Sequence, residues 1–206
     1  MWRLPAARTK VANIALTFDD GPDPRYTPAT LDLLKAHGVK ATFFVIGEKV
    51  QQYPELVRRM ALEGHAIGGH TWHHQEIIGA PANTLHADLL RCRRAILAAC
   101  GIDSMLFRPP RGRVSLAAIH RVCARGYCLV HWSKTYSDYQ RDGVSSLIER
   151  FRQHPPVARD IVLLHDHNQF TIDALATLIP QWRSDGLQFS ALPMQPDQPA
   201  PPTWSP

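Results

Sequence analysis

The alternation of short apolar segments with helical patterns is the feature that most constrains the fold of this chain. Short, nearly continuous apolar runs are typical of strands that are covered on both faces. About seven of them can be recognised, near residues 14–18, 39–47, 66–68, 105–107, 127–132, 161–165 and 187–192. Strands that alternate with helices favour a parallel sheet, so the sequence predicts an α/β fold.

The segments between these strands carry helix signals. Residues 83–100 carry the clearest one, because apolar side chains recur there at spacings of four and three. Thr27 is predicted to cap a helix that Pro28 opens, and Pro180 predicts a bend or break in a helix at residues 171–184. Further helices are expected near residues 54–63, 115–125 and 144–153.

The length of 206 residues fits a single domain with a substantial core. We expect an N-terminal extension at residues 1–10, one folded domain at residues 11–192, and a Pro-rich, disordered tail at residues 193–206. The first residues lack the apolar core of a secretory signal, and no apolar run approaches the roughly 20 residues that span a bilayer. We therefore expect a cytoplasmic protein, or an extracytoplasmic one if a leader has been removed.

Charge and cysteine content exclude some classes of function. The net charge of +5 favours anionic partners only weakly, and no aromatic residues interleave with basic ones, which argues against a nucleic-acid partner. Cys92 and Cys100 share one predicted helix and are about 12 Å apart along its axis, too far for a disulfide. The four cysteines are therefore expected to be buried, reduced thiols, which suits a reducing compartment.

Polar residues that could catalyse a reaction or bind a metal gather at the C-terminal ends of the predicted strands. They are Asp19, Asp20, His70, His74, Arg108, Asp138 and His165. Both barrels and open α/β sheets keep their active sites at this edge. The pattern therefore predicts an active site that several strands share.

Asp19 and Asp20 are adjacent at the end of a strand, where side chains alternate between faces. Because two such acids point in different directions, one can bind a cation while the other takes a proton. With His70 and His74, Asp20 would supply three protein ligands and leave a position for water, as catalytic metal sites do. His73 is an alternative to His74 that spacing does not exclude. A simple turn and ordinary surface histidines would also explain these motifs.

Five segments occur in the order of five known motifs, at residues 17–22, 70–74, 107–112, 132–139 and 163–165. Together they resemble the polysaccharide deacetylase family, which is carbohydrate esterase family four, also called the nodulation-type chitooligosaccharide deacetylase domain. The resemblance covers residues 11–192. It implies a distorted (β/α) barrel with about seven strands, and one divalent cation, usually zinc or cobalt.

The resemblance also implies roles for the residues that match its motifs. Asp20, His70 and His74 would bind the metal, and Asp19 would be the general base. The metal would polarise the acetamide carbonyl and acidify its water, whose proton Asp19 would take.

The remaining motifs imply a general acid and two residues that hold the acid and the base in place. His165 would be the general acid that protonates the departing amine. Asp138 would orient His165 and keep it charged, since a nearby carboxylate favours imidazolium. Arg108 would pair with Asp19.

Four residues are expected to contact the substrate. Leu163 would shape the pocket floor around the acetyl methyl group, and the backbone N–H of Arg111 would add an oxyanion donor. Trp132 and Tyr139 belong to the fourth motif and complete the set. Arg111 stands where the family often has Tyr, Tyr139 where Trp is common, and Gly69 where Asn is common. The extra cation at Arg111 favours an anionic substrate.

The function expected is that of a metal-dependent hydrolase that removes N-acetyl groups from N-acetylhexosamine residues. Its substrate would be a glycan such as a chitooligosaccharide, peptidoglycan or an exopolysaccharide. One alternative is a deacetylase or deformylase of a lipid- or nucleotide-linked amino sugar in the cytoplasm. Another is an inactive carbohydrate-binding module, which would be expected to have lost a ligand or the base.

Overall fold

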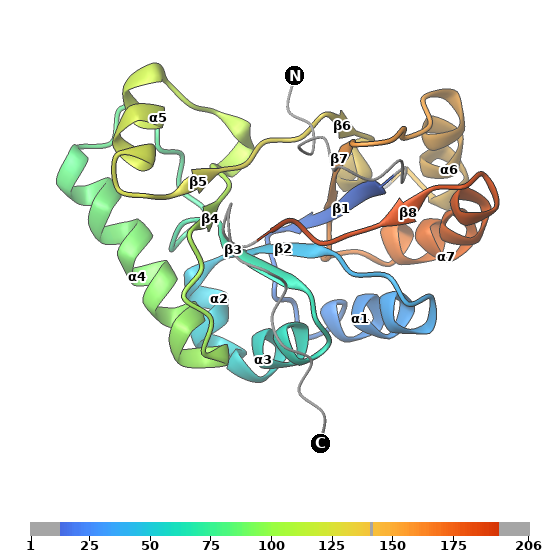
Figure 1. Ribbon diagram of the computed structural model, residues 1–206, viewed down its shortest axis with the longest axis horizontal. Coiled ribbons are helices and arrows are strands. Elements are labelled where there is room, and N and C mark those ends of the chain that lie inside the picture. The colour runs from blue at the N-terminus through green and yellow to red at the C-terminus, as the bar shows by residue number, and fades with distance from the viewer. Residues whose placement is uncertain (1–12, 141, 194–206) are drawn as a thin grey trace.

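A parallel β-sheet forms the centre of the computed structural model, which describes residues 13–140 and 142–193 (Figure 1). The strands of this part are β1 (Asn13–Asp19), β2 (Thr42–Val45), β3 (Ala66–Gly69), β4 (Leu106–Phe107), β5 (Cys128–Leu129), β6 (Lys134–Thr135), β7 (Ile161–His165) and β8 (Gln188–Phe189). Their order is β5-β4-β3-β2-β1-β7-β6, every neighbouring pair is parallel, and β8 pairs with the start of β1. The predicted extension at residues 1–10 and nearly all of the tail lie outside the described residues.

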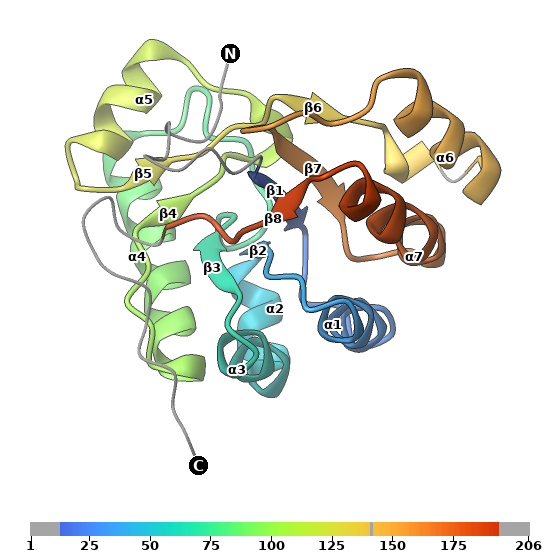
Figure 2. The ribbon, with the colours of Figure 1, turned by 45° about the vertical axis from the view of Figure 1, so that its right-hand side comes forward.

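Helices connect these strands and lie around the outside of the sheet (Figures 1 and 2). They are α1 (Thr27–Ala36), α2 (Gly47–Gln52), α3 (Pro54–Leu62), α4 (Ala82–Cys100), α5 (Leu116–Cys123), α6 (Val144–Gln153) and α7 (Gln169–Ser184), with short 3₁₀ turns at Pro110–Gly112 and Asp138–Gln140. The strand path curls into a half-barrel whose two edges are β5 and β6. The prediction of a distorted (β/α) barrel with about seven strands is therefore confirmed.

The largest hydrophobic core lies between the sheet and the outer helices. Phe18 of β1 and Phe43 of β2 stack there with ring centroids 5.1 Å apart, and apolar residues of α1, α4 and α7 cover them. Cys92 lies in this core, as expected of a buried thiol. Cys123 and Cys128 are exposed instead, because the end of α5 and the edge strand β5 face solvent. The expectation that all four thiols are buried was therefore wrong.

The predicted cap at Thr27 and the predicted break at Pro180 were also wrong. Thr27 is the first residue of α1 and not its cap, and its hydroxyl accepts a hydrogen bond from the Asp23 N–H at 2.8 Å. Pro180 does not break α7, which continues to Ser184. Pro180 is exposed, so the carbonyl that lacks its N–H partner can bind water while the opposite face of α7 stays packed.

Two elements were missed from the sequence. The helix α2 has six residues and a polar sequence that shows no apolar period, and the strand β6 has two residues within an expected loop. Such short elements form through contacts with the rest of the fold, because isolated helices of this length are unstable. Across the described residues, none of the helices is long and apolar enough to cross a membrane.

Candidate active site

The first strand delivers two carboxylates to the C-terminal edge of the sheet. Asp19 ends β1, pairs in register with His165 of β7, and is only 3% exposed. Asp20 follows with a φ of 72°, a left-handed conformation that is uncommon for a residue other than glycine. The chain therefore turns sharply between the two acids, and their carboxylates occupy different positions in the site.

The turn after β3 carries the histidines, and the start of α2 holds it in place. The Gly47 N–H donates to the Thr71 carbonyl at 2.9 Å, and the Glu48 N–H donates to the Trp72 carbonyl at 3.0 Å. Thr71 and His74 both have left-handed φ values, 64° and 58°. Because this backbone is unfavourable for side chains with a Cβ, it depends on the surrounding contacts.

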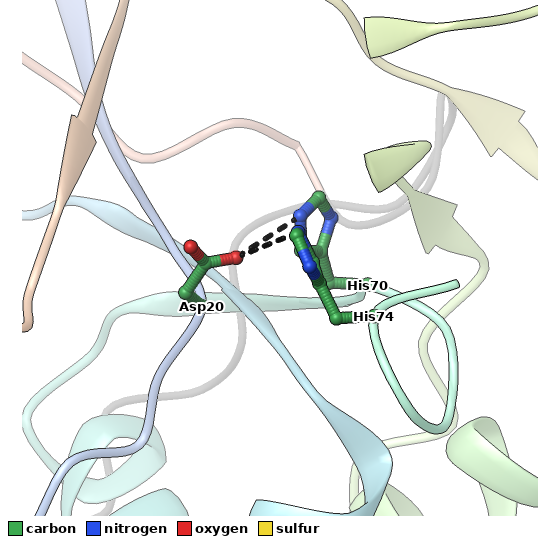
Figure 3. A group of neighbouring side chains, drawn as sticks. All are labelled: Asp20, His70 and His74. Atoms are coloured by element: carbon green, nitrogen blue, oxygen red, sulfur yellow. Dashed lines mark ion pairs between the residues drawn. The ribbon is translucent and has the colours of Figure 1, made fainter. Parts of the chain in front are cut away.

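Three side chains converge in front of this turn, as Figure 3 shows. Asp20 Oδ1 lies 3.4 Å from His70 Nε2 and 3.2 Å from His74 Nε2. The three ligand atoms all lie within 4.8 Å of one another. Oδ1 is buried and makes no hydrogen bond in the described part of the chain. An oxygen and two nitrogens that approach without hydrogen bonds suit a shared cation, so these residues fit a metal site.

The tautomer of His70 supports this interpretation. His70 Nδ1 lies 2.8 Å from the backbone oxygen of Arg108, and a carbonyl can only accept, so Nδ1 carries the proton. The lone pair of Nε2 therefore points toward Asp20. Metal-binding histidines are commonly oriented by such a hydrogen bond from the other ring nitrogen.

The protonation states of the cluster are also those of metal ligands. Burial lowers the pKa of His74 and so favours the neutral imidazole. Burial alone would raise the pKa of Asp20, but the surrounding histidines, among them the charged His165, hold that pKa well below its usual range. Asp20 is therefore ionised at neutral pH, and His74 is neutral.

His73, the alternative to His74, lies outside this cluster. Its Nδ1 is 2.9 Å from Glu48 Oε2, and both side chains are about half exposed. The left-handed turn at His74 brings that imidazole toward Asp20 and leaves His73 on the surface. Spacing in the sequence could not distinguish the two histidines.

Asp19 is held by a buried arginine. Arg108 Nη1 donates to Asp19 Oδ1 and to Thr17 Oγ1, each at 2.7 Å, and the guanidinium lies over the Phe44 ring at 4.1 Å. Arg108 is completely buried, and a buried charge of this kind requires a partner. The second oxygen, Oδ2, lies 3.8 Å from His70 Nε2 and faces the cluster. One oxygen of Asp19 is thus anchored while the other faces the site.

A second carboxylate–histidine pair lies on the opposite side. His165 Nδ1 is 2.8 Å from Asp138 Oδ1, and Asp138 Oδ2 accepts from the His165 N–H at 2.8 Å. Burial by itself lowers the pKa of His165, but the hydrogen bond to Asp138 and the charges of three carboxylates raise that pKa to about 9. His165 Nε2 lies 3.9 Å from Asp20 Oδ2, so a charged imidazole faces the cluster.

A pocket with a volume of about 470 Å³ opens over these residues. Its walls include the four residues predicted to contact substrate, Arg111, Trp132, Tyr139 and Leu163. Arg108 and Asp138 do not line it, since they lie behind Asp19 and His165. The volume is within the range typical of small-ligand sites.

Thr135 and His167 also line the pocket, and sequence reasoning missed them. Thr135 lies within the fourth motif, and His167 is two residues after His165, with ring centroids 5.1 Å apart. Their proximity to known motifs was the only signal that could have found them.

The turn between β4 and α5 shapes one wall of the pocket. Gly112 has a φ of 64°, and a Cβ there would lie 2.4 Å from the Trp132 ring and 2.8 Å from His131 Nε2. Only glycine allows this close approach, so Trp132 reaches the pocket because residue 112 has no side chain.

Arg111 has a partner that the sequence did not suggest. Its Nη1 donates to Glu76 Oε1 at 3.0 Å, and Arg113 Nη1 lies 2.9 Å from Glu76 Oε2. The side chains of Arg111 and Arg113 are 67% and 59% exposed, so these ion pairs contribute little to stability. Two cations share one carboxylate, which leaves a net positive charge at the pocket rim.

The chemistry available to this arrangement follows from its parts. Three ligands can hold a divalent cation with an open position, beside the unanchored carboxylate oxygen of Asp19 and the charged imidazole of His165. These groups are the ones that metal-assisted hydrolysis requires. A parallel half-barrel with this site at its strand ends is the architecture of a metal-assisted hydrolase.

Comparison with known proteins identifies the family. The polysaccharide deacetylase family matches residues 6–130, and the chain belongs to that family. Its members are hydrolases of carbon–nitrogen bonds other than peptide bonds, and they are metal-dependent. The resemblance inferred from five short motifs is therefore confirmed.

Three relatives illustrate the match. Peptidoglycan-N-acetylglucosamine deacetylase of Bacillus cereus is 38% identical in an alignment of 181 residues that covers 85% of this chain and 84% of the relative. Chitooligosaccharide deacetylase of Sinorhizobium fredii is 33% identical over 92% of this chain and 94% of its own. The crystal structure of the Bc1960 peptidoglycan N-acetylglucosamine deacetylase superposes with a TM-score of 0.85 at 31% identity, and covers 90% of this chain and 89% of that chain.

These relatives give no support to the two alternatives considered from the sequence. None of the three is named as a deformylase, as an enzyme of lipid- or nucleotide-linked sugars, or as a binding module.

Proposed function

We propose that this protein removes N-acetyl groups from N-acetylglucosamine residues of a glycan, either a chitooligosaccharide or peptidoglycan. The observation that carries the proposal is the convergence of Asp20, His70 and His74 beside the free oxygen of Asp19 and the charged imidazole of His165. The names of the relatives, which act on these two kinds of glycan, support it.

Asp20, His70 and His74 would hold one divalent cation. Two imidazoles and one carboxylate suit zinc best among common divalent metals, although cobalt accepts the same ligands. A bound cation supplies Lewis acidity at this position, where an amide carbonyl is polarised and a water is acidified.

Asp19 would accept the proton of the attacking water. Its Oδ1 is held by Arg108 at 2.7 Å, which leaves Oδ2 facing the cluster. A base with one oxygen anchored keeps its orientation during the reaction, and its proton transfer needs no rearrangement of the buried ion pair.

His165 would donate a proton to the departing amine. A pKa raised to about 9 keeps the imidazole charged at neutral pH, and the Asp138 hydrogen bond at 2.8 Å holds Nδ1 so that Nε2 faces the site. An amine leaves readily only when it is protonated, which makes this acid necessary. Asp138 acts through His165 and is a positioning residue.

The pocket walls would orient the sugar. Leu163 is 6% exposed and offers an apolar surface for an acetyl methyl group, while Trp132 and Tyr139 offer aromatic faces for sugar rings. Tyr139 is 56% exposed and stands edge-on to the His165 ring at 6.0 Å. The backbone N–H of Arg111 is proposed as an oxyanion donor. If peptidoglycan is the substrate, the protein acts outside the cell membrane, where that polymer lies.

The proposed function is tested by acetate release. The zinc-loaded protein is incubated with N-acetylglucosamine oligomers, peptidoglycan fragments, and lipid- or nucleotide-linked amino sugars. We expect acetate from the oligomers or the fragments and none from the linked monosaccharides. Formate or acetate from the linked sugars alone would contradict the proposal.

Arg111→Tyr is expected to separate charge recognition from catalysis. The backbone donor is kept, and the substitution removes a guanidinium suited to bidentate recognition of an oxyanion. Efficiency (kcat/KM) on an anionic glycan should fall by about tenfold or more, consistent with about 1.5–3 kcal/mol for a hydrogen bond to a charged group. Efficiency on neutral chitooligosaccharides should not fall.

The matched control is Arg113→Tyr, which removes the other cation on Glu76 from outside the pocket lining. It should leave kcat/KM on both substrates within about twofold. Equal efficiencies of parent and Arg111→Tyr on both substrates would show that only the backbone of Arg111 matters.

A further inference from the structure

Both turns that carry the three ligands are attached to one short segment, residues 46–49. Ile46 N–H donates to the Gly21 carbonyl at 2.9 Å, while Gly47 and Glu48 donate to the histidine turn. Lys49 Nζ then donates to the Asp20 carbonyl at 2.7 Å. The segment therefore links the turn that carries Asp20 to the turn that carries the imidazoles.

Lys49 contacts the chain at a left-handed backbone position of the site. Asp20 has a φ of 72°, and a hydrogen bond to its carbonyl restricts rotation of the backbone from which the Asp20 side chain projects. The ammonium group binds that carbonyl from the side of α2, and Lys49 is partly buried.

Asp166 supports the same turn from the other side. It follows His165, is 1% exposed, and lies so close to Gly21 that a Cβ there would be 2.6 Å from both carboxyl oxygens. Asp166 Oδ2 accepts a hydrogen bond from Thr27 Oγ1, which in turn accepts from the Asp23 N–H at 2.8 Å. Its other oxygen is buried and without a hydrogen bond in the described residues.

We propose that Lys49 and Asp166 are positioning residues that clamp the turn at Asp20 and Gly21, and so set the affinity of the three-ligand site for its cation. The inference rests on the proposed function only in that Asp20, His70 and His74 bind a divalent metal. Neither Lys49 nor Asp166 lines the pocket, so neither contacts the substrate.

Charge alone predicts the opposite effect for Lys49. Removal of a positive charge close to a cation site strengthens cation binding by Coulomb's law. Loss of the clamp weakens it, because Asp20 then samples orientations that do not meet the two imidazoles. The sign of the change in affinity therefore distinguishes positioning from simple electrostatics.

The test is zinc titration of the metal-free protein by calorimetry. Lys49→Met keeps the aliphatic stem and should raise the zinc Kd by about tenfold or more, the range typical of residues that orient ligands. The melting temperature of the metal-free variant should stay within a few degrees of the parent. At saturating zinc, kcat should recover to near the parent value.

Lys40→Met is the matched control. Lys40 Nζ also donates to a backbone carbonyl, that of Glu63, and Lys40 does not line the pocket. This variant should keep the zinc Kd of the parent. An unchanged or lower Kd in Lys49→Met would overturn the proposal for Lys49.

Two variants test Asp166. Asp166→Ala removes both the carboxyl group that packs against Gly21 and the acceptor of the Thr27 hydrogen bond. It should raise the zinc Kd by about tenfold or more. Asp166→Asn keeps the size and an acceptor, and should restore the Kd to within about threefold of the parent. If Asp166→Ala fails to fold, an unchanged Kd in Lys49→Met still decides against the clamp.

These outcomes are separable from those of the deacetylase proposal. If the parent releases no acetate but Lys49→Met binds zinc more weakly, the clamp stands and the proposed reaction fails. If the parent releases acetate and Lys49→Met binds zinc as the parent does, the reaction stands and the clamp fails.

Discussion

Asp19→Asn is expected to reduce kcat by about 10²–10⁴-fold while the protein keeps its full complement of metal. The amide has nearly the size of the carboxylate, so the packing around Arg108 should persist. It cannot accept the proton of the attacking water, because an amide is not basic. Steady-state acetate release and the metal content of the purified variant give the two readings.

Asp185→Asn, at the exposed C-terminal end of α7, is the control for the same chemical change and should leave both readings unchanged. The assignment of Asp19 as the base and Asp20 as the ligand would be reversed if Asp19→Asn lost the metal while Asp20→Asn kept the metal but lost turnover.

Removal of the divalent cation is expected to abolish activity. The metal-free protein keeps Asp19 and His165 but lacks the Lewis acid, a contribution of several kcal/mol to stabilisation of the transition state. Addition of zinc or cobalt should restore turnover at one cation per chain. Metal analysis and acetate release measured on the same samples provide the check.

Metal loss should also lower the melting temperature. A ligand at 1,000 times its Kd stabilises the folded state by about 4 kcal/mol, provided the unfolded chain does not bind it. Full activity in a chelated sample that contains no detectable metal would contradict the assignment of Asp20, His70 and His74. His73→Ala should keep the metal, because His73 faces Glu48 at the surface.

The fold and the location of the site follow from local patterns in the sequence. Apolar runs such as Ile161–His165 and the helical period of residues 83–100 are properties of neighbouring residues, so they can be recognised without a structure. Because all parallel strands end at one edge, the polar residues after them must meet there. That argument placed Asp19, His70 and His165 together.

The short elements and the supports of the site were decided by tertiary contacts. The sequence of α2 shows no apolar period, yet residues 46–49 hold both ligand turns. Asp166 carries no signal in the sequence, but its carboxyl packs against Gly21, which follows a strand far away in the sequence. Contacts between distant segments leave no periodic trace in either segment.

The sequence by itself determined which residue types stand at the strand ends. It therefore determined that the site would hold two adjacent carboxylates and several imidazoles. Only the tertiary structure decided which atoms meet. His74 and not His73 reaches Asp20, and Arg111 pairs with Glu76. The reason is physical. A left-handed turn sets the direction of its side chains, and the turn is stable only if segments elsewhere in the chain form hydrogen bonds to it.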